Sequence, residues 1–425
     1  DLRDKLVYIF RDFFDGKSYN AIDEGIERSS TYSGEESKGF PIDVARSILL
    51  GVEDSIKKEG VESFEDSPNF FRMLNGIAFI YKDGFKGEQG QQLVNLFLER
   101  GMNLRLSELA NLTSLIKVIR NVRAKDRFST LLESKLDGIC AEKDWQELGL
   151  ACFSYSNEIA EPAQKRLESE LSKYGLTFVD IKSAWDIYPA SGANSFMNIP
   201  RNLQKMEDLE KERHGLVRTL FSEFGIKEFC RYPVEVLVKQ YDDREKDEPY
   251  GVVLFTNRDH NQSFDMRANV IDSVFKQTGE HGLGMRVAEF ASRYEIMKHF
   301  ASLNNKYGQK NKISYLLLGA HGDANSFGVT YTEEVHKKDL DNKGTRRLKD
   351  YFVENPEIVM ASCSTGADQG IGQKISETFG AVVHAPNKPT NVRSIGVSFD
   401  QDDKPHFKVE YADDVLRTYE MGLKK

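Results

Sequence analysis

The chain has 425 residues, of which 58 are basic and 67 are acidic, so its formal net charge is −9. This length suits two or three domains with a substantial buried core, and the mild acidity argues against a nucleic-acid backbone as the main partner. No apolar run approaches the roughly 18 residues of a membrane span, and the charged residues 1–5 do not predict a signal peptide, so we expect neither membrane association nor secretion.

The N-terminal part has a helical pattern. Apolar residues recur at helical spacing over 2–14, within an N-terminal helical segment that we assign to 1–65. A loop rich in Ser, Gly and Glu follows at 29–37, and such loops are common sites of proteolytic nicking.

Residues 66–240 contain a weak repeat. Similar amphipathic segments recur every 35 or 36 residues, at 92–100, 128–136 and 163–171. Each follows another amphipathic run, which predicts helix pairs stacked as a short α-solenoid, although an ordinary helical bundle fits equally well. We expect an all-α module that binds a protein partner, regulates the chain or acts as a spacer, and we find no catalytic chemistry in it.

The pattern changes after the charged run 242–249, which predicts a solvated linker or hairpin. Strands and helices then alternate, which predicts a doubly wound, mostly parallel α/β sheet in a domain spanning 241–425. The expected elements are a strand at 250–257, helices near 263 and at 293–303, a strand before His321, a helix at 339–353, a strand before Cys363, a helix at 370–380, a strand at 381–386, and an edge hairpin of 395–399 with 407–411.

Two hydrophobic runs in this domain end at reactive side chains. Residues 314–320 lead to His321, and residues 357–362 lead to Cys363. Buried parallel strands have this composition, and open α/β sheets place their sites just past the carboxyl ends of such strands. We therefore expect a thiol and an imidazole on the same edge of the sheet, which suits a nucleophile and its base.

The four cysteines do not form a metal or disulfide pattern. Cys140, Cys152, Cys230 and Cys363 are scattered, with no C-x-x-C pair. This usage suits a reducing cytosol, so we expect a cytoplasmic protein with no metal ion, disulfide or cofactor. We interpret the first three as small core hydrophobes.

The C-terminal 180 or so residues, about 245–425, resemble the caspase-fold cysteine peptidases, which include caspases, metacaspases, separase, gingipains and CHAT domains. The shared pattern is a strand that ends in His-Gly, here His321-Gly322, followed by a strand that ends in Cys with a Gly soon after, here Cys363 and Gly366. Residues 361–366 are most similar to the CHAT and separase-like branch. The step from residue 321 to residue 363 is 42, near the separation of about 50 in caspases.

The resemblance implies a Cys-His dyad. Cys363 is the expected nucleophile, and His321 is the expected acid-base partner. Gly322 is our first candidate for an oxyanion donor together with the Cys363 N–H, because it has no Cβ to block approach to the oxyanion. Gly366 is interpreted as a turn former.

Substrate preference is harder to predict. Metacaspases and similar enzymes that cleave after basic residues often have an Asp two places before the nucleophile, where this chain has Ala361. The candidate pocket residues have both signs of charge, and each taken singly also fits a solvated loop: Arg258, Asp259, Asp323, Asp368, Lys388 and Arg393.

Competing chemistries do not fit the same residues. A Cys-based phosphatase needs an Arg six places after its Cys, where this chain has Gln369, and residues 366–373 lack the Lys and the spacing of a phosphate-binding loop. The acidic residues 400–403 suit a polar hairpin turn better than a calcium site. The other histidines are expected to have structural roles: His214, His260, His281, His299, His336, His384 and His406.

These observations predict a cysteine endopeptidase that acts on protein or peptide substrates and is recruited or regulated through its helical region. A self-processing zymogen is compatible with this prediction, with 29–39 and 239–249 as candidate cleavage loops. The alternative is a non-enzymatic interaction or scaffold protein with a caspase-like fold. Retention of both His321 and Cys363 argues against that alternative.

Overall fold

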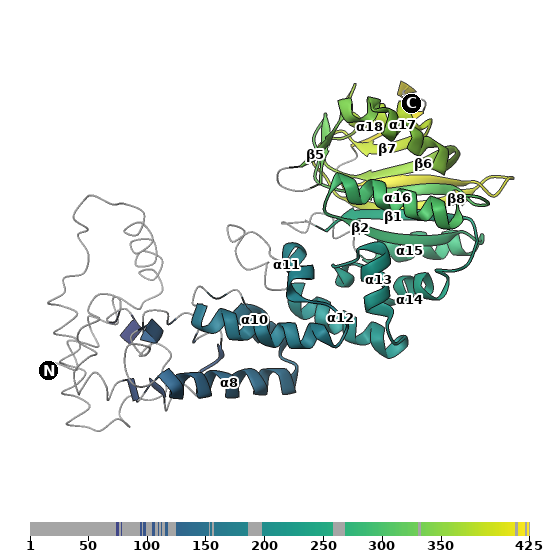
Figure 1. Cartoon of the computed structure of the whole chain (residues 1–425). Coiled ribbons are helices and arrows are strands. Elements are labelled where there is room, and N and C mark those ends of the chain that lie inside the picture. Colours follow the sequence, from purple (N-terminus) through teal and green to yellow (C-terminus); the bar gives the residue numbers. More distant parts are fainter. Residues whose placement is uncertain are drawn as a thin grey trace, which may run out of the picture. The chain divides into compact units, whose positions relative to one another are not determined.

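The computed structural model describes most of the chain from residue 125 onward. The described residues are 125–152, 154, 157–185, 198–257, 268–329, 333–412, 415–420 and 423–424, with isolated positions between 74 and 117 (Figure 1). The chain divides into two compact units, Asp1–Gln164 and Lys165–Lys425.

The described part of the first unit is helical. Its helices are α8 (Lys125–Glu142), α9 (Trp145–Cys152) and the start of α10 (Asn157–Ser172). The predicted helical segments 128–136 and 163–171 are thereby confirmed as helices. In α8, Phe128, Leu132 and Leu136 are buried at a spacing of four residues, which is the apolar stripe of a surface helix. None of the described helices has the length and apolarity needed to cross a membrane.

The second unit begins with helices and continues into the sheet. These helices are α11 (Phe178–Trp185), α12 (Asn198–Glu212), α13 (Leu216–Phe224), η5 (Phe229–Arg231) and α14 (Val234–Asp242). Helix α13 ends at Gly225, whose φ of 67° is left-handed and suits glycine. A Cβ there would lie 2.8 Å from the carbonyl oxygen of Glu289, so the glycine also lets the helix end pack against the sheet.

The expected mostly parallel sheet is confirmed. It has seven strands in the order β11-β10-β7-β6-β3-β1-β2, and those from β7 to β2 are parallel. Strands β10 and β11 are antiparallel and complete one edge. The strands are β1 (Tyr250–Thr256), β2 (Gly284–Phe290), β3 (Ile313–Gly319), β6 (Phe352–Ala361), β7 (Val382–Pro386), β10 (Leu416–Glu420) and β11 (Leu423–Lys424).

The strand order contains one topological switch. The chain steps from β1 outward to β2, then passes back over β1 to β3 and continues to β6 and β7. Because parallel crossovers are right-handed, the first crossover helix covers one face and the later ones cover the other. The carboxyl ends of β1 and β3 therefore form the switch point, where ligands bind in open α/β sheets.

Contacts agree with this two-sided covering (Figure 1). The crossover helices are α15 (Ala268–Gly279), α16 (Arg293–Tyr307) and α18 (Ile371–Phe379). Thr278 of α15 places its hydroxyl 3.5 Å from that of Tyr315 on β3. The ring of Phe352, at the start of β6, lies 5.6 Å from Phe300 of α16 and 5.7 Å from Phe379 of α18.

Strand β2 was not predicted. Its sequence contains Arg286 and Glu289, which do not suit a buried strand, yet both are 1% exposed. Arg286 donates to the carbonyl of Asp243 at 3.1 Å and to Glu248 at 3.2 Å, and it lies over the ring of Tyr307. These tertiary partners satisfy a buried charge that sequence periodicity cannot anticipate.

The outer edge of β2 is capped by side chains. Gln240 of α14 accepts from the Val287 N–H at 2.8 Å and donates to the Val287 carbonyl at 2.9 Å. The Nε2 of His299 on α16 hydrogen-bonds the carbonyl of Glu289 at 2.8 Å. Backbone groups that another strand would otherwise pair are thus satisfied by the helices that cover this edge.

The predicted edge hairpin exists but is elsewhere. Strands β8 (Val392–Phe399) and β9 (Pro405–Tyr411) form a separate two-stranded sheet, so the prediction that they join the edge was wrong. Gln277 of α15 accepts from the Val397 N–H at 2.8 Å, and Phe407 packs on Tyr315 at 5.2 Å. The hairpin therefore packs beside α15 over one face, and β10 and β11 form the edge.

Two further predictions need correction. The single helix expected at 339–353 is instead η6 (Lys337–Asp341), α17 (Lys343–Arg347) and η7 (Leu348–Tyr351) in succession, and β6 begins at Phe352. In the charged run 242–249, Asp243 is buried and pairs with Lys239 at 2.6 Å and with Lys246. This run is therefore anchored to the fold, which makes it a poorer cleavage site than a free linker.

Substitution of Gln240 by Leu is expected to destabilise the second unit by about 2–4 kcal/mol, because it leaves a buried N–H and a buried C=O of β2 unpaired. Urea unfolding measures the change. Gln204→Leu is the matched control, since Gln204 is exposed on α12 and donates a hydrogen bond to its helix neighbour Asp208. Equal midpoints for the two variants would contradict the capping role.

The Asp243 carboxyl predicts a pH-dependent stability. Burial alone raises the pKa of Asp243, but the ammonium groups of Lys239 and Lys246 outweigh burial and hold the pKa below its ordinary value. The resulting stability is present above the unfolded pKa of about 3.9 and is lost as the pH falls through the folded pKa. Asp243→Asn is expected to cost about 1–2 kcal/mol at pH 7, with the difference closing near pH 3 in urea titrations. The neighbouring exposed Asp242→Asn should show a smaller loss; a constant difference at every pH would refute the linkage.

Candidate active site

Strand register brings the two reactive residues to the same level. Strands β3 and β6 are parallel neighbours, and Gly319 pairs with Ala361 at their carboxyl ends. His321 lies two residues beyond Gly319, and Cys363 lies two residues beyond Ala361. Neighbouring strands are about 4.8 Å apart, so both side chains emerge from adjacent positions on one edge, as the sequence predicted.

The loop after β6 holds Cys363 in a sharp turn. Thr365 closes the turn by donating its hydroxyl to the carbonyl of Ser362 at 2.8 Å, and Ser364 has a left-handed φ of 58°. A non-glycine residue at positive φ is uncommon and is often found at functional sites. Cys363 is half-buried, so its thiol is neither sequestered in the core nor fully exposed.

Gly366 anchors this turn to the neighbouring strand. Its N–H donates to the carbonyl of Pro386 at 2.8 Å, and a Cβ there would lie 2.4 Å from the carbonyl oxygen of Ala385. Its own carbonyl accepts from the Tyr419 hydroxyl of β10 at 2.9 Å. The glycine predicted to form a turn is thus also required by close backbone packing.

The loop after β3 is a small antiparallel turn that fixes the backbone of His321. It contains β4 (Ser326–Gly328), which pairs with β5 (Glu334–His336). The Gly328 N–H donates to the carbonyl of His321 at 2.5 Å. The Ile371 N–H at the start of α18 donates to the carbonyl of Ala324 at 2.8 Å, which ties this loop to the segment after Cys363.

Gly322 lies against the cysteine loop. A Cβ on it would be 2.8 Å from Cγ2 of Thr365 and 3.1 Å from the carbonyl oxygen of Cys363. Within the residues that the structure describes, neither the Gly322 N–H nor the Cys363 N–H donates to a hydrogen-bond acceptor. Two backbone donors are therefore available beside the thiol, as an oxyanion hole requires.

The candidate pocket residues differ in their positions and contacts. Asp323 accepts from the N–H groups of Asn325 at 2.6 Å and Ser326 at 2.8 Å, so it shapes the histidine loop. Asp368 is exposed after the cysteine turn, and its carboxylate adds to burial in raising the pKa of Tyr419. Arg258 and Asp259, and also His260, lie outside the described residues.

The two remaining candidates follow β7. Lys388 is exposed, and its carbonyl accepts from the Ser364 N–H at 3.3 Å, which places its backbone beside the turn after Cys363. Arg393 is exposed on β8 and donates to the carbonyl of Ala412 at 3.3 Å. Of these candidates, Asp323 and Lys388 thus contact the loops that carry His321 and Cys363.

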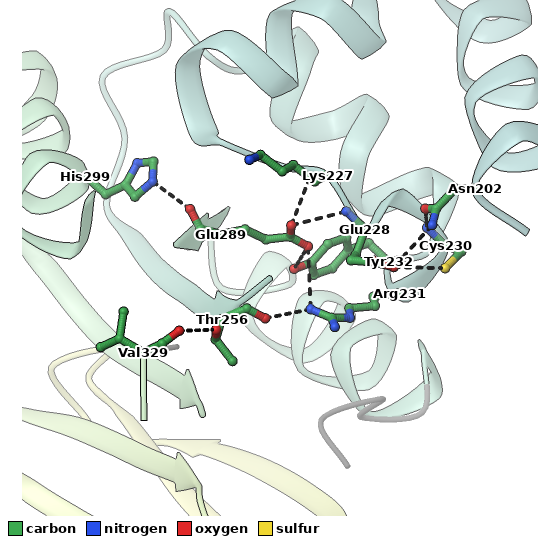
Figure 2. Close-up of polar contacts among 10 residues, drawn as sticks. All are labelled: Asn202, Lys227, Glu228, Cys230, Arg231, Tyr232, Thr256, Glu289, His299 and Val329. Atoms are coloured by element: carbon green, nitrogen blue, oxygen red, sulfur yellow. Dashed lines mark hydrogen bonds and ion pairs between the residues drawn. The ribbon is translucent and has the colours of Figure 1, made fainter. Parts of the chain in front are cut away.

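A buried polar cluster supports the same edge from the β2 side (Figure 2). The Glu289 carboxylate accepts from the N–H groups of Lys227 at 2.8 Å and Glu228 at 3.1 Å, and from the Tyr232 hydroxyl at 2.9 Å. Burial raises the pKa of Glu289, and the guanidinium of Arg231, 3.9 Å away, offsets this only in part. The segment 227–232 is thereby fixed to the sheet.

Arg231 connects this cluster to the histidine loop. Its Nη1 donates to the carbonyl of Thr256, the last residue of β1, at 2.7 Å. The Thr256 hydroxyl donates to the carbonyl of Val329 at 3.0 Å, directly after the Gly328 that holds His321 (Figure 2). A continuous set of polar contacts therefore runs from η5 to the backbone of His321.

Other titratable residues have structural contacts. Glu357 of β6 is buried and bonds His384 at 2.7 Å and His406 at 3.2 Å, so it fixes the β8–β9 hairpin to the sheet. Burial raises the pKa of the Cys152 thiol far above its ordinary value, which makes this cysteine unreactive. Across the described residues, no group of three His, Cys, Asp or Glu side chains could hold a metal ion.

Sequence reasoning missed several buried polar residues at this edge. Tyr411 donates its hydroxyl to the carbonyl of Met360 at 2.8 Å, and Tyr419 supports Gly366, yet both lie about 50 residues away in the chain. Asn257, which directly follows β1, was read as part of a strand. The same signal that points to His321 and Cys363, a hydrophobic run that ends at a polar side chain, is present at residues 252–257 and could have identified it.

No protein-family model, curated protein or solved structure was found to match this chain. The site therefore has to be interpreted from its own geometry.

Gly322→Ala is expected to destabilise the second unit by about 1–3 kcal/mol, since the added methyl forces the histidine and cysteine loops apart. Urea unfolding measures the loss. Gly344→Ala serves as the control, because the nearest atom to a Cβ there is 3.6 Å away and the site is helical. Wild-type stability of Gly322→Ala would show that the two loops are not in tight contact.

Proposed function

We propose that the chain is a cysteine endopeptidase of the caspase-like type, with Cys363 as nucleophile and His321 as acid-base partner. The observation that carries the proposal is the pairing of Gly319 with Ala361, because His321 and Cys363 each lie two residues past these paired ends of adjacent strands. The available N–H groups of Gly322 and Cys363 support it independently.

The geometry supports the following reaction. His321 takes the proton of the Cys363 thiol, and the thiolate attacks the scissile carbonyl carbon. The resulting oxyanion accepts hydrogen bonds from the N–H groups of Gly322 and Cys363. The C–N bond breaks as the imidazolium of His321 protonates the leaving amine, which leaves a thioester. Water attacks the thioester while His321 accepts its proton, and the acid product leaves as the thiol is restored.

We further propose that a protein partner docks on the helical region and recruits or regulates the peptidase, since amphipathic helices supply surfaces for such contacts. Self-processing remains part of this proposal at 29–39, which lies outside the described residues. Cleavage within 239–249 is disfavoured because α14 and the ion pairs of Asp243 hold that segment.

Selective alkylation tests the dyad without a known substrate. Iodoacetamide at pH 7 should modify Cys363 faster than Cys140 and Cys230, which are also half-buried and serve as internal controls in peptide mass spectrometry. His321→Ala is expected to slow the labelling of Cys363 by about 10-fold or more and leave the other two unchanged.

Cleavage of a fluorogenic peptide library should fall to background in Cys363→Ala and by about 100-fold or more in His321→Ala. Cys230→Ala is the matched control and should retain activity. Unselective labelling of the three thiols, together with no effect of His321→Ala, would refute the peptidase.

A further inference from the structure

A third polar residue occupies the same level as the dyad. Strand β1 pairs with β3 so that Phe255 lies opposite Gly319, which itself lies opposite Ala361 of β6. Two residues beyond these three positions come Asn257, His321 and Cys363. Three adjacent parallel strands thus deliver an amide, an imidazole and a thiol in spatial order.

The side chains of β1 and β3 at this level share a face. A Cβ on Gly319 would lie 2.6 Å from the ring of Phe255, so the Phe255 side chain covers the face toward which position 319 is directed. Because strand side chains alternate, residues two places further on return to that face. Asn257 and His321 are therefore expected on the same side of the sheet, at the switch point between β1 and β3.

Asn257 has an unexplained buried carbonyl. The residue is 1% exposed, and its Oδ1 has no hydrogen-bond partner among the described residues. Its backbone is held separately, since its N–H donates to the carbonyl of Phe290 at 3.0 Å. Buried polar atoms without partners are rare, and they call for a functional explanation or an absent partner.

The histidine supplies a suitable donor. The Nε2 of His321 is a buried atom, so this end of the imidazole is turned into the protein. Buried oxygen acceptors commonly orient a catalytic imidazole by accepting from one ring N–H, which fixes the tautomer and presents the other nitrogen to the nucleophile.

We propose that Asn257 is a positioning residue for His321: during catalysis its Oδ1 would accept a hydrogen bond from the Nε2–H of the imidazole, a bond that is not formed in this structure, and would direct Nδ1 toward Cys363. This inference rests on the proposed function and changes a dyad into a Cys-His-Asn arrangement. The amide adds no charge, so it orients the ring without holding it as imidazolium.

The nearby charged groups have other partners. Asp323 accepts from backbone N–H groups of its own loop, and Glu289 is bound by Lys227, Glu228 and Tyr232. Asp368 is exposed after the cysteine turn, and Arg231 donates to the carbonyl of Thr256. Ser362 also has a buried side-chain oxygen without a partner among the described residues, but it lies one residue before Cys363, so strand alternation directs it to the opposite face. The neutral Asn257 is expected to present its unused acceptor on the face of the imidazole.

The test compares wild type, Asn257→Ala, Asn257→Asp, His321→Ala and Asn202→Ala in the full chain. Asn202 is the matched control, because it is also a buried asparagine but both of its amide atoms have partners, at Glu228 and Cys230. The measurements are the rate of iodoacetamide labelling at Cys363 from pH 5 to 9, kcat and KM with a cleaved fluorogenic peptide, and the ¹⁵N shifts of the His321 ring.

Asn257→Ala is expected to lower kcat by about 10–100-fold with KM unchanged, as part of the roughly 10²–10⁴-fold contribution of acid-base catalysis. The His321 ¹⁵N shifts should move from a single tautomer toward a mixture. Asn257→Asp should raise the pH of the acidic limb of the labelling profile, because a carboxylate stabilises the imidazolium. Asn202→Ala should leave both pH profile and tautomer unchanged.

The outcomes separate the two proposals. If His321→Ala does not slow labelling, the peptidase proposal fails. If His321→Ala slows labelling but both Asn257 variants keep the wild-type profile and the wild-type ring shifts, the role of Asn257 is refuted while the dyad stands. Asn257→Asp preserves size and shape, so it keeps the test decisive if the alanine variant does not fold.

Discussion

The candidate site depends on the parallel register of β1, β3 and β6. Phe255, Gly319 and Ala361 lie side by side across three strands. The register alone therefore brings the residues two positions further on close to one another. A shift of one residue in any of these pairings would turn one side chain to the opposite face. Hydrophobic burial therefore fixes the candidate site indirectly. Packing of each strand against α15, α16 and α18 sets its register, and the register determines which polar residue follows the end of the strand.

Buried charges fix the position of the segment beside β2. Glu289 accepts a hydrogen bond from Tyr232 and pairs with Arg231, and these polar contacts are directional, whereas a hydrophobic contact is not (Figure 2). The three hydrogen bonds that the Glu289 carboxylate accepts from Lys227, Glu228 and Tyr232 favour one position for the segment 227–232. Since Arg231 also holds Thr256, the polar cluster and the parallel register constrain the same strand end from two directions.

The sequence predicted those parts of the fold that local pattern determines. The runs of β1 and β3 and the second half of β6 (358–361) are apolar, and α18 ends at Gly380 with a φ of 64°. The sequence could not predict β2, because its buried Arg286 and Glu289 are stabilised by residues distant in sequence. It also could not predict where the β8–β9 hairpin packs, because alternation of apolar and polar residues identifies a strand but not its partner. In the candidate site, the hydrophobic runs that end at His321 and Cys363 predicted these two residues, while Tyr411 and Tyr419 depend on contacts across about 50 residues.

The capped edge of β2 has a consequence for encounters between molecules. An unpaired strand edge is a template on which a strand of another chain can align, and the usual protection is a charge, a proline or a bulge. Here the Gln240 amide makes both hydrogen bonds that a neighbouring strand would make with Val287, and His299 hydrogen-bonds the carbonyl of Glu289. An incoming strand must therefore first displace two buried side chains. The β2 edge therefore resists strand pairing with other molecules even at high protein concentration. Because the protecting groups are neutral, this protection should persist in high salt.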